Sequence, residues 1–179
     1  MSCKAIVALA FIALLSACAV APEGSAPPQF SGTIDQSAPP IIIDGRGGGG
    51  IAQGREYVNR MMARAFSEGR PVRLSGRFTS AGTFALFLVE NVPGSCAEAS
   101  TIFGFHRAVA GVSILTVIPI PLTGSAGDIA NANIAETYNP ALASWFLDGI
   151  ESGRITTLFT NLRGSEMAQF GYPVCDEEQ

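Results

Sequence analysis

Three segments place residues that could do chemistry directly after predicted strands. Gly47, Gly48 and Gly49 belong to a glycine run that follows the first apolar strand, Ser80 opens an apolar helix, and His106 ends a third strand. Glycine lets backbone N–H groups approach a ligand without a Cβ in the way. A serine at a helix start has its hydroxyl in the positive field of that helix, and a histidine near neutral pH can accept its proton. Together these residue types favour acyl transfer.

Each of the three features also has a purely structural explanation. A glycine run is more often a mobile loop, and a serine such as Ser80 is more often a plain helix N-cap. A lone histidine such as His106 is more often a hydrogen-bonded structural residue. The functional prediction therefore depends on the order and spacing of the three features together.

The elements around these residues are predicted to alternate between strands and helices. Apolar residues between Ile51 and Phe66 fall near one helical face, and this helix is expected to stop at residues 69–71. Such alternation predicts an α/β fold with a mostly parallel sheet. Strands are expected at residues 41–43, 72–74, 101–105 and 156–159, with an early edge strand at 30–34. Further helices are expected at 79–89, at 129–150 with a break at 138–140, and at 165–170, whereas 111–127 reads as irregular.

The expected topology brings the three segments together. An open α/β sheet forms its sites in the crevice beyond the carboxyl ends of its strands. The glycine run, Ser80 and His106 each follow such an end, so we expect them to converge although they lie far apart in sequence.

These segments resemble the proteolytic subunit of the Clp protease and the wider Clp/crotonase-like superfamily. Residues 43–54, IDGRGGGGIAQG, resemble that family's glycine motif, and residues 74–84, LSGRFTSAGTF, resemble its nucleophile segment. Residues 96–106, CAEASTIFGFH, resemble the strand that ends in the catalytic histidine, and residues 165–171, SEMAQFG, resemble its late helix. The resemblance runs from about Ile41 to Gly171 and is closest to predicted periplasmic members, which often read Gly-Phe-His here. It implies a spiral of ββα units.

The resemblance also implies a role for each matching residue. Ser80 would be the nucleophile and His106 its general base. The backbone N–H of Ala81, with one N–H from Gly47, Gly48 or Gly49, would form the oxyanion hole.

The family's third catalytic residue, an aspartate before the late helix, has no counterpart in this chain. Phe159, Thr160 and Asn161 occupy that stretch, and only Asn161 could orient an imidazole, as asparagine does in some cysteine proteases. Asn161 or a carboxylate at the second imidazole nitrogen of His106 would indicate an enzyme. An apolar wall formed by Phe159 would indicate a degenerate scaffold.

The first 18 residues have the pattern of a bacterial lipoprotein signal. Lys4 makes a basic start, and residues 5–17 form an apolar run that is too short to span a bilayer. The run ends in a lipobox, LSAC, whose Cys18 would be acylated after cleavage before it. Ala19, where aspartate would resemble an inner-membrane retention signal, points to the outer membrane. An ordinary signal peptide with a cysteine at position 18 by chance is the alternative.

The predicted domain organisation follows from this signal. Residues 1–17 are the signal peptide, residues 18–38 a proline-rich flexible tether, and residues 39–179 one Clp/crotonase-like domain. The domain would be held by lipid in the cell envelope, facing the periplasm.

Composition excludes several other classes of function. Processing would remove Lys4, the one lysine, and leave ten arginines against fifteen acidic residues, a net charge of −5. This is not the basic footprint of a nucleic-acid-binding protein. A single histidine gives no credible metal site, and we expect no cofactor.

Cys96 and Cys175 would remain after processing, and in an oxidising compartment a disulfide is favoured over two free thiols.

Two functions of different classes remain open. One is a membrane-tethered serine hydrolase, most simply a peptidase, which uses Ser80 and His106. The other is a non-catalytic envelope module that keeps the fold and the glycine cleft to bind a peptide or protein. An acyl-thioester site of the crotonase type is weaker, because that cofactor is scarce outside the cytoplasm. Relatives assemble into rings or trimers, so the resemblance also implies a homo-oligomer.

Overall fold

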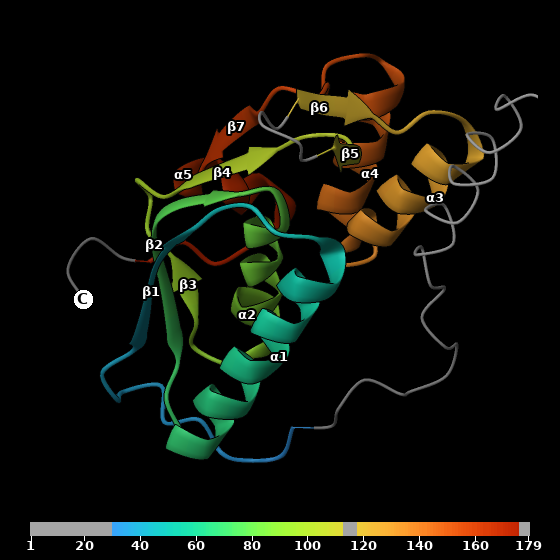
Figure 1. Ribbon diagram of the computed structural model, residues 1–179. Coiled ribbons are helices and arrows are strands. Elements are labelled where there is room, and N and C mark those ends of the chain that lie inside the picture. The colour runs from blue at the N-terminus through green and yellow to red at the C-terminus, as the bar shows by residue number, and fades with distance from the viewer. Residues whose placement is uncertain (1–29, 113–117, 176–179) are drawn as a thin grey trace, which may run out of the picture.

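The computed structural model describes residues 30–112 and 118–175 of the chain, and its centre is a five-stranded sheet. The strands follow the order β1 (Ile41–Arg46), β2 (Val72–Thr79), β4 (Ile102–Phe105) and β7 (Thr160–Arg163), and the short β3 (Cys96–Ala97) also pairs with β2 (Figure 1). β1, β3 and β4 run parallel to β2, and β7 runs antiparallel to β4. The predicted α/β class with a mostly parallel sheet is confirmed.

The two longest strands carry apolar side chains in alternation, as a half-buried strand requires. On β1, Ile41 and Ile43 are buried whereas Ile42 between them is 64% exposed. On β2, Leu74 and Phe78 are fully buried. β2 is central because β1 occupies one of its edges, while β3 and β4 follow each other along the opposite edge.

The predicted helix after the glycine run is confirmed as α1 (Ile51–Glu68). Its buried residues, Gly54, Val58, Met62 and Ala65, lie three or four positions apart and form one stripe. The helix ends at Gly69 with φ +62°, a conformation that glycine adopts without a Cβ penalty.

The apolar helix predicted over residues 79–89 is divided into two parts. A 3₁₀ segment, η1 (Ser80–Ala85), leads directly into α2 (Leu86–Asn91). Both segments contact α1, and Figure 1 shows α1 and α2 side by side on one face of the sheet.

The prediction that residues 111–127 are irregular is wrong for the part of this range that the structure describes, which excludes residues 113–117. β5 (Val109–Val112) and β6 (Ile118–Pro121) form an antiparallel pair, and α3 (Gly124–Ala135) begins soon afterwards. Proline lacks an N–H, but an edge strand tolerates it because one side of the strand has no partner. The two prolines of β6 therefore indicate an edge strand and not the absence of a strand.

The predicted break at residues 138–140 separates α3 from α4 (Pro140–Glu151). Asn139 is the N-cap of α4, where its side chain accepts a hydrogen bond from the Leu142 N–H at 3.0 Å, and Pro140 takes the first helical position. The side-chain amide of Asn139 also donates to the Phe170 carbonyl at 2.7 Å. Asn139 therefore both starts α4 and attaches it to the C-terminal segment.

The last predicted strand is displaced along the chain. Residues 156–159 are the more apolar stretch, but the strand is β7, because Thr160 pairs with Phe105 and Arg163 with Ile102. Pairing with β4 outweighs local strand propensity here. The helix predicted at 165–170 is present as α5 (Gly164–Met167) followed by η2 (Ala168–Phe170).

Residues 30–38 form no edge strand, and they pack against the domain. The Phe30 ring stacks on Phe66 at 6.1 Å, Ile34 is buried, and the Asp35 N–H donates to the Gly69 carbonyl at 2.9 Å. The packed unit thus begins before residue 39, within the segment that the sequence assigns to the tether.

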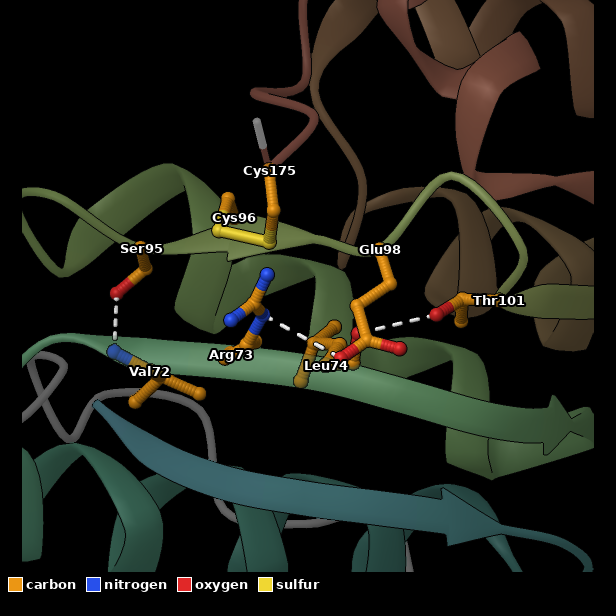
Figure 2. The surroundings of a disulfide bond; sticks show 8 residues. All are labelled: Val72, Arg73, Leu74, Ser95, Cys96, Glu98, Thr101 and Cys175. Atoms are coloured by element: carbon orange, nitrogen blue, oxygen red, sulfur yellow. Dashed lines mark hydrogen bonds and ion pairs between the residues drawn. A yellow bond between two sulfur atoms is a disulfide. The ribbon is translucent and has the colours of Figure 1, made fainter. Parts of the chain in front are cut away.

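The predicted disulfide is confirmed. Cys96 on β3 is bonded to Cys175 (Figure 2), with Cα atoms 5.0 Å apart. A parallel bridge joins the neighbouring Ala97 to Val174. The side chain of Arg73 on β2 lies beneath the disulfide and forms an ion pair with Glu98 at 3.3 Å. The bond therefore joins the C-terminal segment to the sheet.

The signal peptide, Cys18 and most of the predicted tether lie outside the described residues, so lipid anchoring stays a prediction. Among residues 30–112 and 118–175, no helix is long and apolar enough to span a membrane.

Candidate functional site

A cavity of about 270 Å³ lies where the parallel strands end and brings the three predicted segments together. Ser80 and Ala81 line it from the turn after β2, His106 from the end of β4, and Gly49 from the glycine run. The remaining wall is largely apolar and includes Ile51, Phe84, Phe105, Leu122 and Ile134. The cavity therefore combines a hydroxyl, an imidazole and backbone amides with space for an apolar group.

Ser80 has an unusual backbone conformation. Its φ of +56° makes it the one non-glycine residue with positive φ in the described ranges. Holding such a residue in the left-handed region costs on the order of 1 kcal/mol or more, and such residues cluster at functional sites. Ser80 lies between β2 and η1, so it occupies a sharp strand-to-helix turn. In α/β hydrolases a turn of this kind presents the nucleophilic serine.

Two glycines let neighbouring elements approach this turn. A Cβ on Gly82 would collide with the carbonyl oxygen of Arg46, so the end of β1 packs directly on η1. A Cβ on Gly54 would lie 2.6 Å from the Phe84 ring and 3.0 Å from the Ala81 Cβ. Gly82 allows the Arg46 backbone to approach, and Gly54 leaves room for the Phe84 ring and for Ala81, so a side chain at either position would force its neighbours to move.

His106 is half-buried, and the position of its proton follows from its neighbour. Its Nδ1 lies 2.7 Å from the carbonyl oxygen of Arg107. A carbonyl only accepts, so Nδ1–H is the donor, and in the neutral ring Nε2 carries the lone pair. Within the described part of the chain, no hydrogen bond joins His106 to Ser80.

Among the described residues, Asn161 makes no hydrogen bond to the imidazole of His106. Asn161 on β7 pairs with Gly104, and its Oδ1 accepts a hydrogen bond from Arg77 Nη2 at 3.4 Å. The Phe159 ring instead contacts the His106 ring edge-on, with centroids 5.1 Å apart and planes at 85°. The contact predicted for Asn161 is thus made by a backbone carbonyl, that of Arg107. In the described ranges no carboxylate hydrogen-bonds the imidazole.

The glycine run contributes to the cavity through its last members. Gly49 and Gly50 line it, whereas Gly47 packs near the hydroxyl of Thr79 and neither Gly47 nor Gly48 is part of the lining. The Gly50 N–H donates to Gln53 Oε1 at 3.1 Å, so this amide is already used at the start of α1. Gly49 is therefore the predicted oxyanion-hole glycine that the geometry favours. Gly50 is not among the glycines predicted for the oxyanion hole, although its place before Ile51 marks it as the N-cap of α1.

Thr83 and Tyr138 are further cavity residues that sequence analysis missed. The Thr83 hydroxyl donates to the Ser80 carbonyl at 2.7 Å, and Thr83 Oγ1 lies 2.7 Å from the Tyr138 hydroxyl. Burial raises the pKa of Tyr138 well above its ordinary value of 10.0, so the phenol is neutral at physiological pH. Tyr138 was interpreted only as part of a helix break, and nothing in its local sequence indicates contact with Ser80.

α3 lines one side of the cavity through Ala130 and Ile134 and is held by polar contacts in its C-terminal half. Asn131 accepts a hydrogen bond from the Ala108 N–H at 2.7 Å through its buried side chain. Arg55 on α1 donates to the Asn133 carbonyl at 3.0 Å and lies 3.5 Å from the Glu136 carboxylate. These contacts place Ile134 in the apolar wall.

No group of three or more metal-ligating side chains is found within residues 30–112 and 118–175. Compared with known proteins, the sequence matches no protein-family model and no curated protein.

Proposed function

We propose that the protein is a serine hydrolase of the cell envelope, acting by acyl transfer through Ser80 and His106. The observation that carries this proposal is the positive φ of Ser80 at a strand-to-helix turn that shares a cavity with His106. A strained backbone conformation at a serine needs surrounding structure to maintain it, and a purely structural N-cap needs no such conformation.

The reaction follows from the residues that line the cavity. Ser80 Oγ attacks the carbonyl carbon of an ester or amide while Nε2 of His106 takes its proton. The Ala81 and Gly49 N–H groups would stabilise the oxyanion. The bond to the leaving group then breaks, and the leaving group takes the proton from Nε2. Water releases the acyl group by the same route in reverse, and Ser80 regains its proton.

The Arg107 carbonyl performs one of the two roles of a triad aspartate, because it orients the imidazole of His106. It holds the Nδ1–H of His106 and so selects the tautomer in which Nε2 is the base. It carries no full charge, so it stabilises the imidazolium less than an aspartate does. A slow hydrolase is the expected result.

Substrate, fold family and location complete the proposal. The apolar wall suits an apolar acyl group or side chain, and a peptide is the substrate that the Clp-like motifs imply. The parallel strands and the site at their carboxyl ends support a Clp/crotonase-like spiral of ββα units. The resemblance to Clp-like proteins also implies a homo-oligomer.

Acylation of Cys18 would hold the enzyme at the outer membrane facing the periplasm.

A second candidate is a non-catalytic envelope module that binds a peptide or protein in the same cavity. It is favoured by the Phe159 ring, which packs edge-on against the imidazole, and by the lack of a carboxylate hydrogen bond to that imidazole among the described residues. Such a module would keep the cavity without turnover.

Labelling the purified full chain with a fluorophosphonate separates the two functions. If the protein is a hydrolase, the wild-type chain is labelled at Ser80 and Ser80→Ala is not labelled. Ser75 is a half-buried serine on β2, so Ser75→Ala is the control and should keep the label. If the wild-type chain takes up no more label than Ser80→Ala, the hydrolase proposal is wrong and the binding module remains.

A further inference from the structure

We infer that Thr83 and Tyr138 are positioning residues that hold Ser80 in its left-handed conformation through a directed chain of two hydrogen bonds. The inference rests on the proposed function, because it assigns these hydroxyls to the presentation of the nucleophile. Both residues act through the backbone of Ser80 and not on the reacting atoms.

The direction of the chain is fixed by hydrogen-bond chemistry. A carbonyl oxygen carries no proton, so the 2.7 Å contact between Thr83 Oγ1 and the Ser80 carbonyl uses the one proton of the Thr83 hydroxyl. Thr83 can then only accept in its 2.7 Å contact with Tyr138, which must donate. The order is Tyr138 to Thr83 to the Ser80 carbonyl, and it exists only while the phenol keeps its proton.

Burial makes this chain rigid. Thr83 is 1% exposed and Tyr138 is 8% exposed, so water does not replace either bond. The Tyr138 ring is held edge-on by Phe84, Phe105 and Phe146, with centroids 5.7 to 6.2 Å away. An anchored phenol transmits its position to the Ser80 backbone, which would otherwise relax from φ +56°.

The origin of the two residues supports a positioning role. Thr83 belongs to η1 and lies three residues after Ser80. Tyr138 lies 55 residues after Thr83, in the connection between α3 and α4. Asn139, the next residue, donates its side-chain amide to the Phe170 carbonyl at 2.7 Å. The connection that supplies Tyr138 is thus itself attached to the C-terminal segment, so the turn at Ser80 depends on a fixed distant element.

The test compares two tyrosines that each lose one buried hydroxyl. Tyr138→Phe removes the donor to Thr83, and Tyr172→Phe removes the acceptor of the Asn139 N–H without touching the chain to Ser80. Thr83→Val removes the middle hydroxyl, and Thr83→Ser restores it. The readouts on the full chain are the fluorophosphonate labelling rate and amide hydrogen exchange in residues 79–86.

We expect Tyr138→Phe and Thr83→Val to slow labelling by about ten-fold or more, with Thr83→Ser and Tyr172→Phe within about three-fold of wild type. Hydrogen exchange in residues 79–86 should rise in Tyr138→Phe and stay unchanged in Tyr172→Phe. Equal effects of the two tyrosine variants on both readouts would overturn the inference.

The exchange measurement keeps this inference separate from the proposed function. If wild-type Ser80 is not labelled, the hydrolase proposal fails, and the exchange pattern alone decides the positioning role. Faster exchange confined to Tyr138→Phe and Thr83→Val then supports it, and unchanged exchange refutes it. Should Thr83→Val not fold, Thr83→Ser and Tyr138→Phe still decide the outcome.

Discussion

The imidazole of His106 is oriented by the carbonyl group of the next residue, since its Nδ1 lies 2.7 Å from the Arg107 oxygen. This contact leaves Nε2 as the acceptor in the neutral ring, which is the arrangement that a general base requires. The residue expected to do this work, Asn161, is instead hydrogen-bonded to Arg77.

Replacing Asn161 should therefore have little effect on Ser80 reactivity. We expect Asn161→Ala to label within about two-fold of wild type, whereas His106→Ala should label about 100-fold more slowly, the usual scale for losing a general base. Fluorophosphonate labelling rates at pH 7 measure both. A ten-fold loss in Asn161→Ala would show that Asn161 orients the imidazole during the reaction.

The close packing at Gly82 predicts a large difference between two glycines. Gly82→Ala would drive a Cβ into the Arg46 carbonyl and should lower the free energy of unfolding by about 2 kcal/mol or more. Gly50→Ala is the control, because its Cβ would meet nothing within 4 Å, and it should cost less than about 1 kcal/mol. Urea unfolding measures both, and equal losses would contradict the packing described for η1.

Removing the disulfide should destabilise the domain substantially. Cys96 and Cys175 are 79 residues apart, and the chain-entropy account gives about 4 kcal/mol as an upper value for a loop of this length. The double variant Cys96→Ala/Cys175→Ala should unfold at lower urea concentration than the wild type. The wild-type chain in reducing agent is the control and should match the double variant. An unchanged unfolding midpoint would show that the bond contributes nothing.

The buried tyrosines predict a loss of stability at alkaline pH. Burial raises the pKa of Tyr172 from 10.0 to about 12 and raises that of Tyr138 still further. Folding therefore favours the neutral phenols, so their contribution is complete below pH 10 and is lost as the pH rises through the folded-state values. Urea midpoints should fall between about pH 10 and about pH 12. The urea midpoint of Tyr172→Phe should fall less steeply over this range than that of the wild type. Identical pH profiles of the two proteins would argue against the raised pKa of Tyr172.

Anchoring by Cys18 predicts a specific labelling pattern. Cys18→Ala should accumulate as an unprocessed precursor that takes up no palmitate, because the acylated thiol is missing. Cys3→Ala is the matched control, and it should be processed and acylated normally, since residue 3 leaves with the signal peptide. A normally processed, soluble product from Cys18→Ala would refute the lipoprotein assignment.

Local patterns were sufficient for much of the architecture. The helical periodicity of α1, its stop at Gly69 and the break at residues 138–140 depend on neighbours within a few residues, so the sequence alone predicts them. The convergence of the glycine run, Ser80 and His106 was also predictable, because parallel strands end at one edge of their sheet. The pairing of Cys96 with Cys175 followed from two cysteines remaining after processing.

Tertiary structure decided the features that depend on distant or backbone partners. β7 pairs with β4 four residues later than its apolar stretch suggests, because the partner strand determines register. The Arg107 carbonyl cannot be recognised in a sequence, since every residue has one. The positive φ of Ser80 and its link to Tyr138 arise only when η1 packs against the α3–α4 connection, 55 residues away along the chain. The sequence by itself thus determined that the glycine run, Ser80 and His106 meet at one cavity, and only the fold decided which other residues line it and how the imidazole and the serine are held there.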